Sequence, residues 1–189
     1  MRKILLWVPL AGCCLACTRP ENIAGPEGFL NLDSLVYAQE KFSADFIKNV
    51  SLDGKIGDSV IQSPGDWKAQ LSFLQRLEVM KKPVYRKSYS TSLEKDSLSN
   101  LWVKTWESSD STAPVRFLKI YFVEQPYKAI RMIADVREKN ILFSKSENYV
   151  LHFDAFRPRV DRFQITGTQK VIWMDPRSYA IDVRVRYTR

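Results

Sequence analysis

The stretch Tyr179-Ala-Ile-Asp-Val-Arg-Val-Arg-Tyr187 decides the fold, because it carries the most regular pattern in the chain. Apolar or aromatic side chains at the odd positions alternate with charged or small side chains at the even positions. Successive side chains of a β-strand point to opposite faces, so a period of two predicts a strand with one buried face and one solvated face. The C-terminal segment therefore indicates an antiparallel sheet that is packed on one side only.

The segment 160–173 has a similar alternation and precedes this strand by a turn around Asp175-Pro176. We predict that the two segments form an antiparallel pair with one apolar face, which Gln169 alone interrupts. On the other face the same register sets Lys170 opposite Asp182. The facing pairs expected on the apolar side are Trp173–Tyr179, Val171–Ile181, Gln169–Val183, Gly167–Val185 and Ile165–Tyr187.

Further short segments with a period of two lie between Val84 and Asp154, and polar connections separate them. A parallel pair of strands would need a crossover of about a dozen residues or more, so these short connections predict that consecutive strands pair in antiparallel fashion. The strands expected before the last two are 84–91, 101–107, 115–122, 127–137, 141–145 and 149–154. Together with the C-terminal pair they form a β-meander.

A first helix is expected at about 32–49, where Asn31 or Asp33 can serve as the N-cap. Apolar residues in this segment recur at spacings near three, four and seven, which is the pattern of one face of a helix. These residues are Leu32, Leu35, Phe42, Phe46 and Val50. We interpret the following residues 51–62 as a loop with a short extended piece at 59–61.

A second helix is expected to begin at Ser63-Pro64-Gly65-Asp66, which resembles a capping box with Asp in place of Glu. Lys81 and Lys82 supply positive charge at the negative end of the helix dipole, and Pro83 ends the helix. Its apolar stripe consists of Trp67, Leu71, Leu74 and Leu77.

These elements predict an α+β fold, with two N-terminal helices followed by a seven- or eight-stranded antiparallel meander that curves over them as a half-barrel. The helices and the sheet each have one apolar face, and packing these faces together buries both. At the level of the fold, this arrangement resembles the lipoprotein carriers of the bacterial envelope.

The N-terminal segment Met1 to Cys17 has a positive head, Arg2-Lys3, followed by an apolar run that ends among small residues and cysteines. Such a run predicts a secretory signal and is too short to span a bilayer. The segment resembles the signals of bacterial lipoproteins, which close with a Leu-small-small-Cys box whose cysteine becomes the lipidated N-terminus.

Two cysteines compete for this role. Leu10-Ala11-Gly12-Cys13 matches the box at each position but leaves nine residues after Lys3 for the hydrophobic region, whereas Cys17 gives a region of thirteen. We favour Cys17 on the length of this region, with Cys13 as the alternative.

The expected organisation is a lipoprotein signal at 1–17, a tether at 18–30 with Pro20, Gly25 and Pro26, and a single α+β domain at 31–189. The resemblance implies an outer-membrane lipoprotein that faces the periplasm. Its first partner is then the membrane that holds the acyl chains, and an exported chain does not meet nucleic acid.

Composition excludes several kinds of chemistry in the expected domain. With 45% hydrophobic and 12% aromatic residues, the chain can form a substantial core. All three cysteines lie between Cys13 and Cys17, and His152 is the single histidine. Disulfides and thiolate catalysis are therefore not expected, and neither is a transition-metal cofactor, because such metals normally need two or more imidazole or thiolate ligands. We expect no cofactor.

Positive charge is concentrated at the C-terminal end of a chain whose formal net charge is +8. From Phe156 to Arg189 there are eight basic residues against three aspartates. The residues expected to form a basic face are Arg157, Arg159, Arg162, Arg184 and Arg186. Such a face is either a solvated sheet surface or a contact for an anionic partner.

His152 and Asp154 form a His-x-Asp pattern on an expected strand and could share a face as an acid–base pair. No nucleophile motif or phosphate loop accompanies them, so we expect a structural histidine and a protein that is not an enzyme.

Four aromatic residues are candidate ligand contacts, because Trp102 and Trp106 share one expected strand face and Tyr85 and Tyr89 are similarly spaced on the preceding strand. They could line an apolar cavity, or they could be ordinary core and cross-strand pairs. We therefore expect a non-catalytic lipoprotein that binds an apolar or amphiphilic ligand on the concave side of its sheet. A lipoprotein that docks a partner protein or an envelope polymer through the basic face is the first alternative, and a periplasmic hydrolase is the second.

Overall fold

The computed structural model describes residues 31–123 and 128–188, so the expected signal segment, tether and lipidation site lie outside the described residues. The helices are α1 (Leu32–Glu40), α2 (Trp67–Gln70), η1 (Ser72–Lys81, a 3₁₀-helix) and α3 (Pro83–Arg86). The strands are β1 (Ala44–Leu52), β2 (Lys55–Ile56), β3 (Val60–Gln62), β4 (Tyr89–Lys95), β5 (Trp102–Ser108), β6 (Val115–Val123), β7 (Lys128–Lys139), β8 (Phe143–Phe153), β9 (Val160–Val171) and β10 (Arg177–Tyr187).

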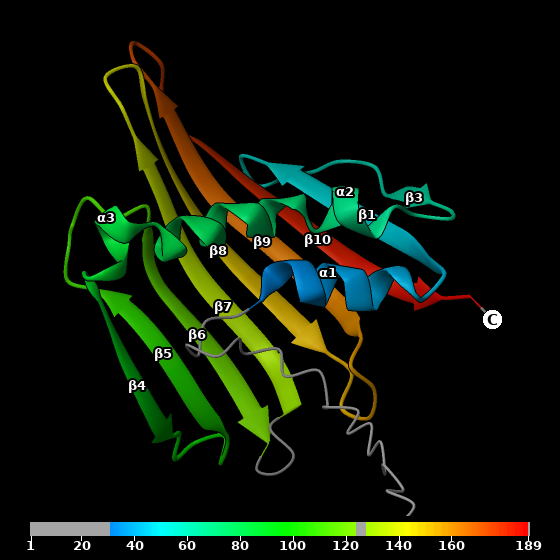
Figure 1. Ribbon diagram of the computed structural model, residues 1–189. Helices are drawn as coiled ribbons and strands as arrows, with labels where there is room; N and C mark the ends of the chain where they lie inside the picture. The colour runs from blue at the N-terminus through cyan, green and yellow to red at the C-terminus, as the bar shows by residue number, and fades with distance from the viewer. Residues whose placement is uncertain (1–30, 124–127, 189) are drawn as a thin grey trace, which may run out of the picture.

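The strands form one antiparallel sheet in the order β2-β1-β10-β9-β8-β7-β6-β5-β4, with β3 paired to β1. The predicted meander is confirmed from β4 to β10, where each strand pairs with the next one along the chain. Helices α1, α2 and η1 lie in front of one face of this twisted sheet (Figure 1). The fold is therefore mainly β with a few short helices, which fits the predicted α+β class only in outline.

The prediction of two helices before the sheet was wrong, because α1 ends at Glu40 and the chain then forms β1. Phe46 and Val50 are four residues apart, which fits a helix, but Ala44, Phe46 and Val50 also lie on the even positions of a period of two that Lys48 interrupts. Strand β1 pairs along its whole length with β10. This long-range pairing decides between the two periods, and it gives the C-terminal strand a second neighbour that sequence order did not indicate.

The second predicted helix begins later and has a different geometry. Asp66 rather than Ser63 is the N-cap of α2, since its side chain accepts a hydrogen bond from the Lys68 amide, while the Ser63 hydroxyl donates to Asp45. The chain then continues as the 3₁₀-helix η1. Its buried residues recur every three positions, and a 3₁₀-helix stacks residues i and i+3 on one ridge. The buried ridge consists of Leu71, Leu74, Leu77 and Met80.

Two strand predictions were also wrong in their bounds. Residues 83–86 form α3, so the strand expected at 84–91 is β4 and begins at Tyr89. The two strands expected at 141–145 and 149–154 are a single strand, β8, which runs through Ser146-Glu147-Asn148. Three consecutive polar residues favour a turn, but Glu147 is a buried member of the strand and is paired with other side chains.

Strands β9 and β10 pair in antiparallel fashion as predicted, but their register differs by six residues. Tyr179 lies opposite Gly167 rather than Trp173, and Val183 lies opposite Phe163 rather than Gln169. The shift is even, so the faces are unchanged: Val183 is buried and Arg184 is exposed. The observed register removes the polar mismatch at Gln169, and it leaves residues 172–176 for a loop instead of strand pairing.

The core lies between the helices and the face of the sheet that they cover, which we call the inner face. Large side chains from both layers fill this space, including Phe46, Trp67, Tyr149 and Phe163, each 3% exposed or less. The opposite, outer face carries the even-numbered residues of β8 and β10 and, after the bulge that turns Val160 into the core, those of β9 from Arg162 on. Among the described residues, no helix is both long and apolar enough to cross a membrane.

Candidate functional site on the inner face

Glu147 on β8 is a carboxylate in the apolar inner face, with 7% of its surface exposed. The hydroxyl of Tyr149 donates a hydrogen bond to it at 2.8 Å, and the hydroxyl of Tyr179 from β10 donates another. The ammonium of Lys145 lies 2.9 Å from its Oε1. Arg76 of η1 forms an ion pair with its Oε2. We call these five residues the Glu147 cluster. In this cluster, the guanidinium group of Arg76 links the 3₁₀-helix η1 to the sheet.

The environment of Glu147 keeps its carboxyl group ionised. Burial by itself would raise the pKa of Glu147, but hydrogen bonds from Tyr179, Lys145 and Tyr149, together with the charge of Arg76, lower the pKa below its ordinary value. Burial also raises the pKa of the two tyrosine hydroxyls, so both remain protonated donors at neutral pH. The buried charge of Glu147 is therefore compensated by several partners at once.

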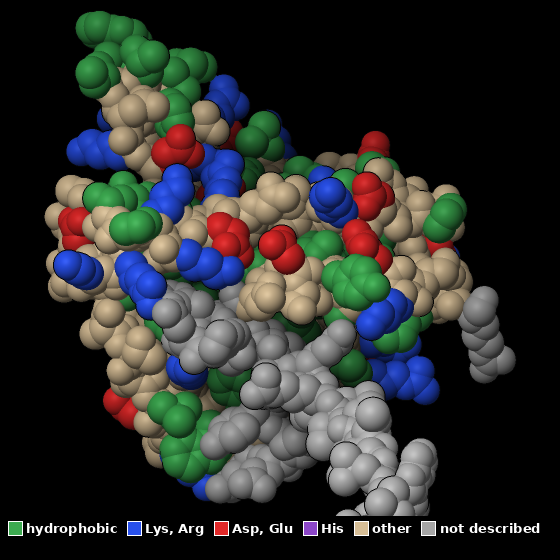
Figure 2. All heavy atoms as spheres, in the orientation of Figure 1, with side chains coloured by type: hydrophobic (Ala, Val, Ile, Leu, Met, Phe, Trp, Pro, Cys, Tyr) green, Lys and Arg blue, Asp and Glu red, His purple; other side chains and the backbone are tan. Residues whose placement is uncertain are grey.

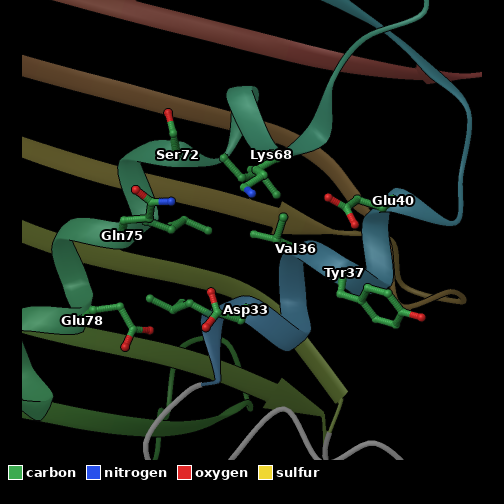
Figure 3. A pocket seen from close by; sticks show the side chains of 11 residues that line it. Asp33, Val36, Tyr37, Glu40, Lys68, Ser72, Gln75 and Glu78 are labelled. Carbon is green, nitrogen blue, oxygen red and sulfur yellow. The ribbon is translucent and has the colours of Figure 1, made fainter.

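A groove of about 150 Å³ separates α1 from η1 on the outside of the helical layer. Figure 3 shows Asp33, Val36, Tyr37 and Glu40 on the α1 side and Ser72, Gln75 and Glu78 on the η1 side. Ligand pockets usually have volumes of about 300–1,000 Å³, so this groove is small for a ligand site. Its buried floor, formed by Leu32, Leu71 and Leu74, shows where the two helices meet above the core.

The predicted aromatic residues are only partly brought together. Trp102 and Trp106 share the inner face of β5, as expected, and Trp106 is 2% exposed while Trp102 is half-buried. Tyr89 starts β4 and donates its hydroxyl to the Val115 carbonyl at 2.7 Å. Burial raises the pKa of Tyr89 to about 12. Tyr85 belongs to α3, so it does not share a strand face with Tyr89.

The predicted basic residues do not form one uniform positive surface, since three of the five are in ion pairs. Arg162 binds Asp182 through two hydrogen bonds, and Arg186 binds Asp45 at 2.8 Å. The guanidinium of Arg159 lies 4.0 Å from the centre of the Tyr187 ring and forms an ion pair with Asp154. Arg157 is exposed in the loop between β8 and β9, and Arg184 is exposed on the outer face.

Arg184 and Arg162 do lie directly opposite each other, and they continue a row of arginine and histidine side chains across the outer face, which we call the basic row; sequence reasoning missed its other two members. Arg162 faces His152, and His152 faces Arg131 on β7. The guanidinium of Arg131 lies 4.1 Å from the centre of the Tyr121 ring, and its Nε is buried without a hydrogen-bond partner among the described residues. Only the cross-strand register reveals this row, because neighbouring members are 10 to 22 residues apart in the sequence.

His152 and Asp154 do not form the acid–base pair that their spacing offered. Strand β8 ends at Phe153, and Asp154 accepts hydrogen bonds from the Phe156 and Arg157 amides in the following turn. Burial, followed by the charges of Arg131 and Arg162, lowers the pKa of His152, so the imidazole is neutral at pH 7. Within residues 31–123 and 128–188, no cluster of three or more His, Cys, Asp or Glu side chains has the arrangement of a metal site.

Comparisons with known proteins leave the site to be interpreted from its own geometry. No protein-family model, curated protein or solved structure matches the chain.

Proposed function

We propose that the protein is a non-catalytic lipoprotein of the bacterial envelope, anchored to the outer membrane through Cys17 and facing the periplasm. In this proposal it binds the apolar part of an amphiphilic ligand on the inner face of its sheet. The observation that carries the proposal is the cover of that face: an apolar surface lies beneath the 3₁₀-helix η1, which the ion pair between Arg76 and Glu147 joins to the sheet.

A 3₁₀-helix of ten residues is a weak cover by its own hydrogen bonds, because their geometry is poorer than in an α-helix and runs beyond three or four residues are uncommon. Helix η1 is held mainly by the buried side chains of Leu74, Leu77 and Met80. Exposing three such side chains costs roughly 5–9 kcal/mol, and burying an acyl chain returns about 0.8 kcal/mol per methylene. An acyl chain of about six to eleven methylenes therefore offsets the displacement of the helix.

The Glu147 cluster opposes the replacement of η1 by a ligand, because an ion pair of this cluster must break first. The interior is filled in the closed arrangement, so a ligand enters only when η1 moves and the Arg76–Glu147 pair separates. Glu147 keeps Lys145, Tyr149 and Tyr179 as partners when Arg76 leaves. The sheet side of the pair thus remains satisfied while the helix side, which is nearly half exposed, becomes solvated.

The test of ligand binding compares two cations on the same helix. Arg76 pairs with the sheet, whereas Lys81 pairs with Glu78 within the helix. Arg76→Ala is expected to raise the binding of a fluorescent fatty acid several-fold, because the cover loses its charged contact, while Lys81→Ala leaves it unchanged. Native mass spectrometry of the protein purified from its own membranes is expected to detect a bound lipid. No lipid, together with equal dye binding by both variants, would contradict the proposal.

The anchor is tested separately by metabolic labelling with a clickable fatty acid. Labelling is expected to be lost in Cys17→Ala and retained in Cys13→Ala. The reverse pattern would assign the acyl chains to Cys13 instead.

The basic row on the outer face favours a second candidate function, the docking of an anionic partner protein or envelope polymer. Arg131, His152, Arg162 and Arg184 lie side by side on four adjacent strands. If docking is the main function, Arg184→Glu weakens the capture of a partner from solubilised envelopes, whereas the Arg76 variant does not.

A further inference from the structure

Two hairpin turns meet at one end of the sheet and expose five large apolar side chains. The β7–β8 turn carries Ile141 and Leu142, which are 91% and 63% exposed. The β9–β10 loop carries Ile172, Trp173 and Met174, which are 43%, 95% and 55% exposed. We call these five residues the apolar tip. In Figure 1 the two turns project beyond the rest of the molecule, and Figure 2 shows hydrophobic side chains gathered at this projecting end.

The apolar tip is a built feature of the fold. The amide of Ile172 donates a hydrogen bond to the Leu142 carbonyl at 2.8 Å, which joins the two turns, and Phe143 pairs with Val171 just below them. The Asn140 side chain accepts hydrogen bonds from the amides of Leu142 and Phe143, each at 2.8 Å. The two turns therefore present their side chains as one unit.

Trp173 has a backbone φ of +66°, a conformation that a bulky side chain rarely adopts. The Met174 amide donates to the Val171 carbonyl at 3.1 Å and closes the turn around it. Exposed apolar patches of this kind mark an interaction site, and backbone strain is found where a side chain is held for a function.

Basic residues surround the apolar tip. Five of them, Arg137, Lys139, Lys145, Lys170 and Arg177, lie within a few residues of the two turns, near the acids Glu138 and Asp175. Three of the five pair with carboxylates, Arg137 with Asp135, Lys145 with Glu147 and Arg177 with Asp53, so among the described residues Lys139 and Lys170 carry the positive charge that is free for a partner. Lys139, Ser144 and Lys170 line a groove of about 250 Å³ just below the tip. Within the part of the chain that the structure describes, Lys139 and Lys170 form no ion pair. Positive charge next to exposed apolar side chains complements an anionic membrane surface, whose headgroups lie above its acyl chains.

We propose that the apolar tip inserts into the headgroup region of an anionic lipid bilayer, with Trp173 at the interface and Lys139 and Lys170 against lipid phosphates. Tryptophan is enriched at membrane interfaces because its ring is amphipathic. A protein partner fits the tip less well, since a stable protein interface uses about 20–30 residues on each side and the two turns offer fewer than ten. This inference is independent of ligand binding at the inner face.

The experiment places a fluorescent probe at single positions in the full-length chain. Replacing Cys13, Cys14 and Cys17 with serine removes every thiol, so Trp173→Cys can be labelled alone with an environment-sensitive dye. The matched control is Leu98→Cys, because Leu98 is 96% exposed in the β4–β5 turn at the opposite end of the sheet (Figure 1). Vesicles contain phosphatidylglycerol and brominated phosphatidylcholine, whose bromines quench a probe that enters the bilayer.

With these vesicles, the probe at position 173 is expected to shift to shorter emission wavelengths and to be quenched at least two-fold more than the probe at position 98. Lys139→Gln and Lys170→Gln are each expected to lower this insertion about five-fold, from about 1 kcal/mol per basic residue near an anionic surface. Added salt should weaken it in the same direction. Equal quenching at both positions, or a tip probe that stays unquenched, would overturn the proposal.

Discussion

Gly167 on β9 lies directly opposite Tyr179 on β10, and the tyrosine ring occupies the space that a side chain at position 167 would need. A Cβ at this position would lie 2.7 Å from both Cζ and the hydroxyl oxygen of Tyr179, and 2.9 Å from the Ser146 carbonyl. The ring is fixed in this place because its hydroxyl donates to Glu147. The glycine therefore lets β10 reach across one strand to the Glu147 cluster on β8.

Gly167→Ala is expected to lower the free energy of unfolding by about 1–3 kcal/mol, because the added methyl group must displace a ring that is held by a hydrogen bond. Urea denaturation measures this loss. In a Tyr179→Ala background the same substitution should cost less, since only the Ser146 carbonyl then opposes the methyl group. Equal costs in the two backgrounds would show that the two residues are not coupled.

Glu147→Gln is expected to lower the free energy of unfolding above pH 4.5. The difference in this free energy between wild type and variant should shrink as the pH falls. The pKa of the carboxyl group in the folded protein lies below its ordinary value of 4.5, so the charged form adds stability that is present above that pH. The added stability is lost as the pH falls through the lowered pKa. Urea denaturation of both proteins between pH 3 and pH 7 measures the difference, and a constant difference over this range would contradict the assignment.

Leu74→Ala and Gln75→Ala compare two neighbouring positions on η1. Leu74 is on the buried ridge and Gln75 is exposed, so Leu74→Ala is expected to cost about 2–5 kcal/mol and Gln75→Ala less than about 0.5 kcal/mol. Thermal unfolding of both variants checks this order. Similar losses at both positions would argue against the 3₁₀ ridge as the contact that holds the helix.

His152→Gln is expected to leave ligand binding unchanged and to flatten the dependence of stability on pH near neutrality. Burial and the flanking charges of Arg131 and Arg162 lower the pKa of His152 below 6.5 in the folded protein. The wild type therefore loses stability as the pH falls from 6.5 toward that lowered pKa, and the glutamine variant lacks this loss. A hundred-fold loss of a hydrolytic activity in the variant, with the fold intact, would instead support the hydrolase alternative.

Local patterns predicted the strands whose two faces have different environments. β5, β6, β9 and β10 are found near their predicted bounds, because alternation along a strand is a property of neighbouring residues and survives without knowledge of the partner. The same pattern also predicted which residues of β9 and β10 share a face. It did not predict their register, because Phe163 and Gln169 are both compatible with a partner on β10 until the loop and the next strand are in place.

The candidate site was hidden for a related reason. Glu147 and its polar neighbours resemble a turn in the sequence, and no sequence signal shows that Arg76, 71 residues away, supplies the compensating charge. The exact spacing of three among the buried residues of η1 was visible in the sequence and could have indicated a 3₁₀-helix, but it is also compatible with an α-helical stripe.

The sequence by itself determined that the chain forms a one-sided antiparallel meander with its helices against the apolar face, because burial of alternating side chains depends mainly on local order. Only the tertiary structure decided that residues 44–52 form a strand beside β10, that Glu147 lies inside a strand, and that two distant turns form one apolar tip. In each of these cases the stabilising partner is far away in the sequence, and its contribution to the free energy appears only when the chain has folded.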